Sequence, residues 1–260
     1  MMLVPLVAVG ILAAAVVDAR APAEEAMEEG QEEGKATTVR LRLPSILASH
    51  MVLQHSAPVT IWGWAPPQQR VRVRLGGHAR VEATATAGGT FVAVLPPQPP
   101  ASAPAEITVS SGTETIMLTD VLFGTVVLCA GQSNMGLGVE ATENARQVLA
   151  RAASEDRPSL RLVNVANTET GCNSTSPLTD VTTDRPWSSP TAISPSNYSA
   201  ACYFLGLELS QQHHGHPFGM ITAACATPDD PPLLILCSLR IECPPLHVSG
   251  WFKSQGEGSE

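Results

Sequence analysis

The sequence predicts a small antiparallel β domain followed by an α/β domain with a mostly parallel sheet. Residues 37–119 alternate apolar and polar side chains in short runs separated by proline and glycine pairs, which is typical of half-buried antiparallel strands. From residue 120 onward, a continuous apolar run precedes a stretch with helical spacing and a second apolar run, which is the pattern of a parallel βαβ unit. The 22 Pro and 20 Gly in 260 residues indicate many turns and argue against a long helical bundle.

The first 21 residues have the pattern of a secretory signal peptide. An apolar stretch from Leu3 to Val17 precedes small residues suited to cleavage. This stretch of about 15 residues is shorter than the roughly 20 that a membrane-spanning helix needs, although a short uncleaved anchor is the alternative. Residues 22–36 follow as an acidic linker that is too polar to pack. We therefore expect a secreted or lysosomal protein whose mature chain does not span a membrane.

The charge of the chain is concentrated in that linker. The formal net charge is −9, but six glutamates fall within residues 24–33, so the remainder carries −3. The chain has only two lysines and no basic run, which disfavours a nucleic-acid partner. Arginines that alternate along predicted strands are expected on the solvent face of a sheet; they are Arg40, Arg42, Arg72 and Arg74.

The elements of the predicted β domain are short. Its strands are predicted at residues 39–43, 59–62, 71–75, 91–95 and 107–109, with turns at 66–67, 76–77, 88–89 and 96–97. This spacing is typical of an antiparallel sandwich, which we place at residues 37–119.

The predicted α/β domain begins at Asp120. Its elements are a strand at 126–130, a helix from Glu140 to Ala153, a strand at 160–165, a helix at 199–211 and a strand at 218–225. The second helix is expected to bury Cys202, Leu205 and Leu209 on one face. The intervening stretch 166–197 is long for a structureless loop, so it is either a functional insertion or contains an element that the pattern does not reveal.

Cysteines and sequons fit a secreted protein. Six cysteines are candidates for disulfides, but six allow 15 pairings and the sequence does not choose among them. They include no CxxC pair, so a zinc site is not supported. Asn173 and Asn197 begin N-glycosylation sequons. The neighbouring His213, His214 and His216 are expected at a solvated helix end rather than in a metal site, and His50 and His55 at the surface.

Ser133 is the candidate reactive residue. It lies in the turn directly after the first parallel strand, where open α/β sheets bind ligands. Gly131 permits a sharp turn, and amides at the start of the following helix could stabilise an oxyanion. A serine that only caps that helix is the alternative that position leaves open.

Several segments resemble the sialate O-acetylesterases, within the broader SGNH (GDSL-like) hydrolases. The most specific is Gly131-Gln132-Ser133-Asn134-Met135. The others lie at 51–54, 59–63, 120–124, 127–130, 187–191, 199–206 and 217–221, so the resemblance covers about residues 45–222. It implies an SGNH-hydrolase-like α/β fold with a flavodoxin-like parallel sheet, preceded by a β-sandwich.

The resemblance also implies a function. Such enzymes remove O-acetyl groups from sialic acids with a Ser nucleophile, a His base and an Asp that orients the His. Ser133 matches the nucleophile, and its backbone amide is expected in the oxyanion hole. Gln132 and Asn134 are expected to bind substrate, an O-acetylated sialic acid or sialoglycan. Neither a metal nor an organic cofactor is implied.

Other parts of the family pattern are missing. Residues 223–228 read Ala-Ala-Cys-Ala-Thr-Pro where a Trp-Gly-Gly-Thr segment is expected, and no Asp stands three residues before a His. We therefore expect a partial hydrolase domain at 120–225, a divergent Pro-rich tail at 226–260, and a truncated chain that is weakly active or inactive and of low stability. A non-catalytic secreted glycan-binding module and a non-functional splice product are the alternatives.

Overall fold

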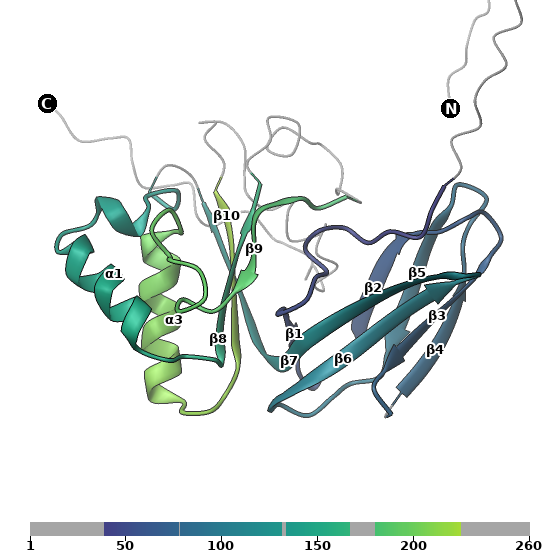
Figure 1. Cartoon of the computed structure of the whole chain (residues 1–260), viewed down its shortest axis with the longest axis horizontal. Coiled ribbons are helices and arrows are strands. Elements are labelled where there is room, and N and C mark those ends of the chain that lie inside the picture. Colours follow the sequence, from purple (N-terminus) through teal and green to yellow (C-terminus); the bar gives the residue numbers. More distant parts are fainter. Residues whose placement is uncertain (1–38, 78, 132–133, 167–179, 225–260) are drawn as a thin grey trace, which may run out of the picture. The chain divides into compact units, whose positions relative to one another are not determined.

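The computed structural model describes residues 39–77, 79–131, 134–166 and 180–224. All of these residues belong to one compact unit (Figure 1). The predicted signal peptide at 1–21, linker at 22–36 and tail at 226–260 lie outside the described residues.

The first seven strands form a mainly antiparallel part of the fold, in which the first strand is the exception because it pairs parallel with the seventh. They are β1 (Val52–Gln54), β2 (Val59–Trp64), β3 (Arg70–Leu75), β4 (Ala79–Thr84), β5 (Thr90–Leu95), β6 (Ala101–Ser111) and β7 (Glu114–Gly131). β4, β3, β6 and β7 are neighbours in one sheet, and β2 pairs with β5 in a second. Every second side chain of β3 and β5 is buried, because successive side chains of a strand point to opposite faces.

One predicted strand of this region is wrong. Residues 39–43 form no strand, and only Arg42 makes an isolated bridge, to Trp64. The Arg42 guanidinium stacks 3.4 Å from the centre of the Trp64 ring. Pro44 follows directly and cannot donate a hydrogen bond to extend the pairing. The alternation nevertheless predicts burial at Leu41, which is 8% exposed.

β7 connects the antiparallel and parallel parts. Its first half pairs antiparallel with β6, and residues 125–131 pair parallel with β10 (Phe218–Ala224). The strand therefore runs through the boundary that the sequence suggested between residues 119 and 120. One hydrophobic cluster includes Val109 and Leu95 together with Val163 and Ile221, so the two parts share a core. The separate β-sandwich domain stays a prediction.

The parallel part contains the remaining elements. They are the 3-10 helix η1 (Val139–Ala141), α1 (Ala145–Ser154), β8 (Leu160–Val165), β9 (Thr183–Ser188), α3 (Ala200–Gln212) and β10. β7, β10 and β8 are parallel, and β9 pairs antiparallel with β8 (Figure 1). The predicted parallel sheet is therefore confirmed.

The order of the parallel strands differs from the flavodoxin-like order. In that order the first strand lies between the second and third, whereas here β10, the third, lies between β7 and β8. Gly124 makes room for β10, because a Cβ atom there would stand 2.0 Å from the Pro217 carbonyl oxygen.

The helices and the long loop also differ in detail from the sequence patterns. α1 begins at Ala145 rather than Glu140, after Asn144 in the left-handed region (φ 59°). α3 buries Cys202, Tyr203 and Gly206, whereas Leu205 is 45% exposed. A Cβ atom on Gly206 would lie 2.9 Å from Met220, so this close approach selects the face that packs. The stretch 166–197 contains β9, which Pro186 and charged residues conceal from pattern analysis.

None of the helices within the described part of the chain is long and apolar enough to cross a membrane.

Candidate active site at the carboxyl end of β7

The predicted nucleophile turn lies at the carboxyl edge of the parallel strands. Gln132 and Ser133 lie outside the described residues, but Gly131 and Asn134 flank them. Gly131 ends β7 and pairs with Ala224, the last residue of β10. Asn134 is exposed in a turn. The turn therefore follows the strand ends where open α/β sheets bind ligands, as the sequence predicts.

The backbone turns sharply after β7. A Cβ atom on Gly131 would lie 2.9 Å from the Met135 Cβ, closer than side chains normally approach. The sulfur of Met135 in turn accepts a hydrogen bond from the Ser199 hydroxyl at 3.2 Å. Gly131 is thus required by close approach, which agrees with its predicted role.

The segment after the turn is fixed to the start of α3. The backbone amide of Ala200 donates to the Leu137 carbonyl at 2.8 Å, and that of Val139 to the Tyr198 carbonyl at 3.1 Å. A disulfide joins Cys129 of β7 to Cys202 in the first turn of α3. The remaining four cysteines lie outside the described residues. These links position both ends of the Ser133 turn against α3.

Helix capping falls to residues other than Ser133. Ser199 is the N-cap of α3, and its hydroxyl accepts from the Cys202 amide at 3.3 Å. α1 has Asn144 as its N-cap, and η1 has Gly138. Each described helix thus has another residue as its N-cap, and the role of Ser133, which lies outside the described residues, stays a prediction. The first described helices after the turn are η1, from Val139, and α1, from Ala145, so the expected oxyanion amides of a following helix also stay a prediction.

The second sequon borders this region. Asn197 is exposed, and in the orientation that satisfies both partners its amide nitrogen donates to the Glu140 carboxylate at 2.8 Å. The Ser196 hydroxyl donates to the same carboxylate at 2.5 Å. Glycosylation of Asn197 stays a prediction, and Asn173 lies outside the described residues.

Asn164 is a polar residue near the site that sequence analysis missed. It follows Leu162 on the face of β8 that packs toward α3, and it pairs with Thr222 of β10. Its side-chain oxygen is buried and has no hydrogen-bond partner among the described residues. A single Asn within an apolar strand gives no signal by itself.

Three described histidines lie at the opposite end of the parallel strands. His213 caps the carboxyl end of α3, next to His214, and the His216 Nε2 lies 2.9 Å from the Thr125 hydroxyl. Thr125 pairs with the first residue of β10. Gly131, the end of β7, follows it by six strand residues, which is about 20 Å. Burial, followed by the charges of His55 and His213, lowers the pKa of His216. The prediction of a solvated helix end is therefore incomplete for these three histidines, because His216 contacts Thr125 of β7.

An Asp–His pair exists, but it lies far along β7 from Gly131. The His50 Nδ1 lies 2.7 Å from an Asp120 carboxylate oxygen, which Arg161 also contacts at 2.8 Å. The eleven residues from Asp120 to Gly131 span about 36 Å along β7. His78 and His247 lie outside the described residues. Neither His50 nor the group at 213–216 therefore lies near Gly131, the last described residue before the Ser133 turn. Within the described part of the chain, no group of three or more His, Cys, Asp or Glu could hold a metal ion.

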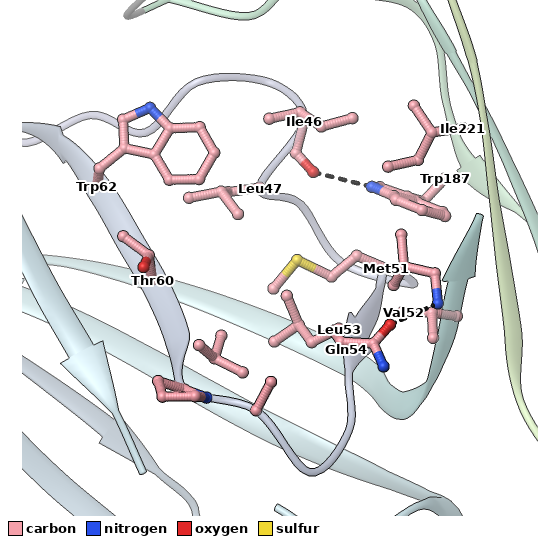
Figure 2. A pocket seen from close by; sticks show the side chains of 14 residues that line it. Ile46, Leu47, Met51, Val52, Leu53, Gln54, Thr60, Trp62, Trp187 and Ile221 are labelled. Carbon is pink, nitrogen blue, oxygen red and sulfur yellow. Dashed lines mark hydrogen bonds between the residues drawn. The ribbon is translucent and has the colours of Figure 1, made fainter. Parts of the chain in front are cut away.

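A separate apolar pocket of about 380 Å³ lies on the other face of the sheet (Figure 2). Trp62, Met51 and Trp187 line it together with Ile221, and the Trp187 indole nitrogen donates to the Ile46 carbonyl at 2.8 Å. No lining residue is charged. Val126, at its wall, precedes Gly131 at the end of β7 by five residues, about 17 Å. The pocket is thus distinct from the Ser133 turn.

Comparison with known proteins finds relatives among the sialate O-acetylesterases and a similar solved structure. No protein-family model matches the chain. The chain is 30% identical over 205 residues to the sialate O-acetylesterase of Mus musculus and 31% identical over 206 residues to that of Homo sapiens. These alignments cover 73% of this chain but 37% and 38% of the relatives. Among solved structures, it resembles a carbohydrate acetylesterase from Xanthomonas citri with a TM-score of 0.62 and 26% identity, over 71% of this chain and 40% of that chain.

Proposed function

Since the chain is a homologue of the sialate O-acetylesterases over 73% of its own length, as its sequence segments indicated, we propose that it carries the nucleophile region of a carbohydrate O-acetylesterase. The observation that carries the proposal is the position of the Gly131–Met135 block at the carboxyl end of β7. The chain spans about 38% of the length of the curated relatives. Its activity therefore has to be tested directly.

In the proposed reaction, the Ser133 hydroxyl attacks the acetyl carbonyl of an O-acetylated sialic acid. The backbone amide of Ser133 stabilises the tetrahedral oxyanion. The sugar oxygen leaves with a proton, the acetyl group remains on Ser133 as an ester, and water releases acetate. Gln132 and Asn134 contact the sugar. The predicted signal peptide would bring the chain into the secretory pathway, where we expect it to meet this substrate.

The distribution of histidines supports weak activity. A serine hydroxyl is a weak nucleophile at neutral pH without an adjacent base, and the described histidines lie at the other end of the parallel strands. Loss of triad members costs several orders of magnitude in serine hydrolases. We expect the isolated chain to release acetate far more slowly than a complete enzyme.

The experiment measures acetate release from O-acetylated sialic acid and from p-nitrophenyl acetate. The full chain is compared with Ser133→Ala and with Ser102→Ala, which changes an exposed serine of β6. Slow release that Ser133→Ala abolishes and Ser102→Ala leaves unchanged supports the proposal. Release that is unaffected by Ser133→Ala contradicts the nucleophile assignment. Fast, Ser133-dependent turnover contradicts the expectation of weak activity.

A further inference from the structure

The outer face of β3 and β4 gathers arginines. Along β3, Val71, Val73 and Leu75 are buried, so Arg70, Arg72 and Arg74 project together on the exposed face. On β4, the edge strand of this sheet, Arg80 stands opposite Arg74 and Glu82 stands opposite Arg72. These two strands thus present four guanidinium groups on one surface, here called the arginine face (Arg70, Arg72, Arg74 and Arg80).

The arginine face has an excess of positive charge. Glu82 is the shared acidic partner of three of its members, at 3.2 Å from Arg70, 3.2 Å from Arg72 and 2.5 Å from Arg80. Arg74 has no ion pair among the described residues. On the neighbouring β6, Thr108 and Ser110 are uncharged, and Glu106 adds one further carboxylate. The face therefore keeps a net charge of +2 in a chain whose formal charge is −9.

This arrangement is unfavourable for the sheet itself. Arg74 and Arg80 are directly opposite each other on paired strands, and like charges in such positions destabilise a sheet. An acidic residue at position 74 or 80 would form a cross-strand ion pair there, as Glu82 does with Arg72. An external anion would remove the repulsion in the same way.

We propose that the arginine face binds sialylated glycan chains through their carboxylates. A guanidinium offers parallel donors that match a carboxylate in two-point contact. Alternate residues of a strand are about 6.7 Å apart and neighbouring strands about 4.8 Å, so the groups form a flat array suited to an extended chain with repeated carboxylates. The choice of sialic acid rests on the proposed function, whereas the preference for an anion rests on the face itself.

The test measures binding of the full chain to polysialic acid at low and at physiological salt. Arg74→Gln should weaken binding several-fold, and Arg70→Gln, Arg72→Gln and Arg74→Gln together should weaken it by at least about tenfold. Glu82→Gln should strengthen it, because it removes the competing carboxylate. Arg146→Gln, which changes an exposed arginine of α1 by the same single charge, should leave it unchanged. Salt should weaken binding of the wild-type chain.

Several outcomes would overturn the proposal. Equal loss with Arg74→Gln and Arg146→Gln would indicate only net charge, and weaker binding by Glu82→Gln would contradict the competition. Tighter binding to heparin or DNA than to polysialic acid would overturn the assignment to sialic acid. Ser133→Ala should bind as tightly as the wild-type chain, because β6 separates β3 from β7. The binding result is therefore independent of the esterase result, and a negative esterase assay does not contradict the binding proposal. Circular dichroism checks that each variant is folded.

Discussion

Cys129 and Cys202 form a disulfide whose Cα atoms lie 5.8 Å apart, and it ties the last residues of β7 to the first turn of α3. Cys129 stands four positions before Ser133 and Cys202 three positions after the Ser199 cap. Backbone hydrogen bonds from Ala200 and Val139 join the same two regions. The covalent link and these hydrogen bonds therefore hold the candidate nucleophile turn from both sides.

Removal of this disulfide should lower the free energy of unfolding substantially. The bond closes a loop of 73 residues, and cross-linking a loop of this length contributes about 4 kcal/mol in the chain-entropy account. Urea unfolding of Cys129→Ala with Cys202→Ala measures the loss. Each single variant should lose nearly as much as the double variant, because either change breaks the same bond. Additive single losses would show that packing, rather than the bond, accounts for the effect.

Gly124→Ala should weaken the packing of β7 against the start of β10 and lower the free energy of unfolding. The Cβ atom of Gly124→Ala would lie 2.0 Å from the Pro217 carbonyl oxygen, which is backbone and cannot rotate away. We expect a loss of about 3 kcal/mol or more in unfolding free energy, as for other severe overpacking. Gly77→Ala is the matched control, since nothing lies within 4 Å of its added Cβ. Equal melting temperatures for the two variants would contradict the tight contact.

The sequence predicts the parallel part well because its signals are local. The apolar run ending at Ala130 and the helix containing Cys202 are strong, short-range patterns, and they place Ser133 at a strand end. The sequence pattern did not predict β9, because an edge strand tolerates Pro186 and charged residues that are unusual in a central strand. The position of β10 between β7 and β8 depends on a close approach at Gly124. A single glycine in a sequence does not indicate which distant residue will pack against it.

The candidate site is less predictable because its contacts are long-range. The Cys129–Cys202 bond was one of 15 pairings, and the contact between Met135 and Ser199 joins residues far apart in the chain. Asn164 gave no pattern at all. Conversely, Asp120 and His50 form a pair that no local spacing indicated, and only the structure shows that eleven residues of extended strand, in β7, lead from it to Gly131.

The buried hydroxyl of Tyr198 should contribute measurably to stability. It donates to the Met220 carbonyl at 2.6 Å, next to the Cys202 sulfur. Burial raises the pKa of Tyr198, so the hydroxyl keeps its proton. Tyr198→Phe leaves that carbonyl short of a donor, and we expect a loss of about 1–2 kcal/mol in urea unfolding. Tyr203→Phe removes a hydroxyl that makes no hydrogen bond among the described residues, and it should cost less. A larger loss for Tyr203→Phe would contradict this assignment.

Asp120 should make the stability of the chain depend on acid pH. Burial by itself would raise the pKa of the Asp120 carboxyl, but the hydrogen bonds from His50 and Arg161 and the Arg161 charge together hold it below its usual range. A lowered pKa in the folded state means that the carboxylate stabilises the fold above the ordinary pKa, near 4. This contribution is lost as the pH falls through the lowered pKa. The unfolding free energy should therefore decline below about pH 4.

Two substitutions separate this charge effect from the backbone. Asp120 has a φ of 53°, a conformation that Asn tolerates and Ala does not. Asp120→Asn should cost about 2 kcal/mol at neutral pH, because Arg161, whose side chain is 9% exposed, loses its charged partner. It should also flatten the acid dependence, and Asp120→Ala should be less stable still because it adds backbone strain. An acid decline in Asp120→Asn as steep as in the wild-type chain would assign the pH dependence to other carboxyl groups.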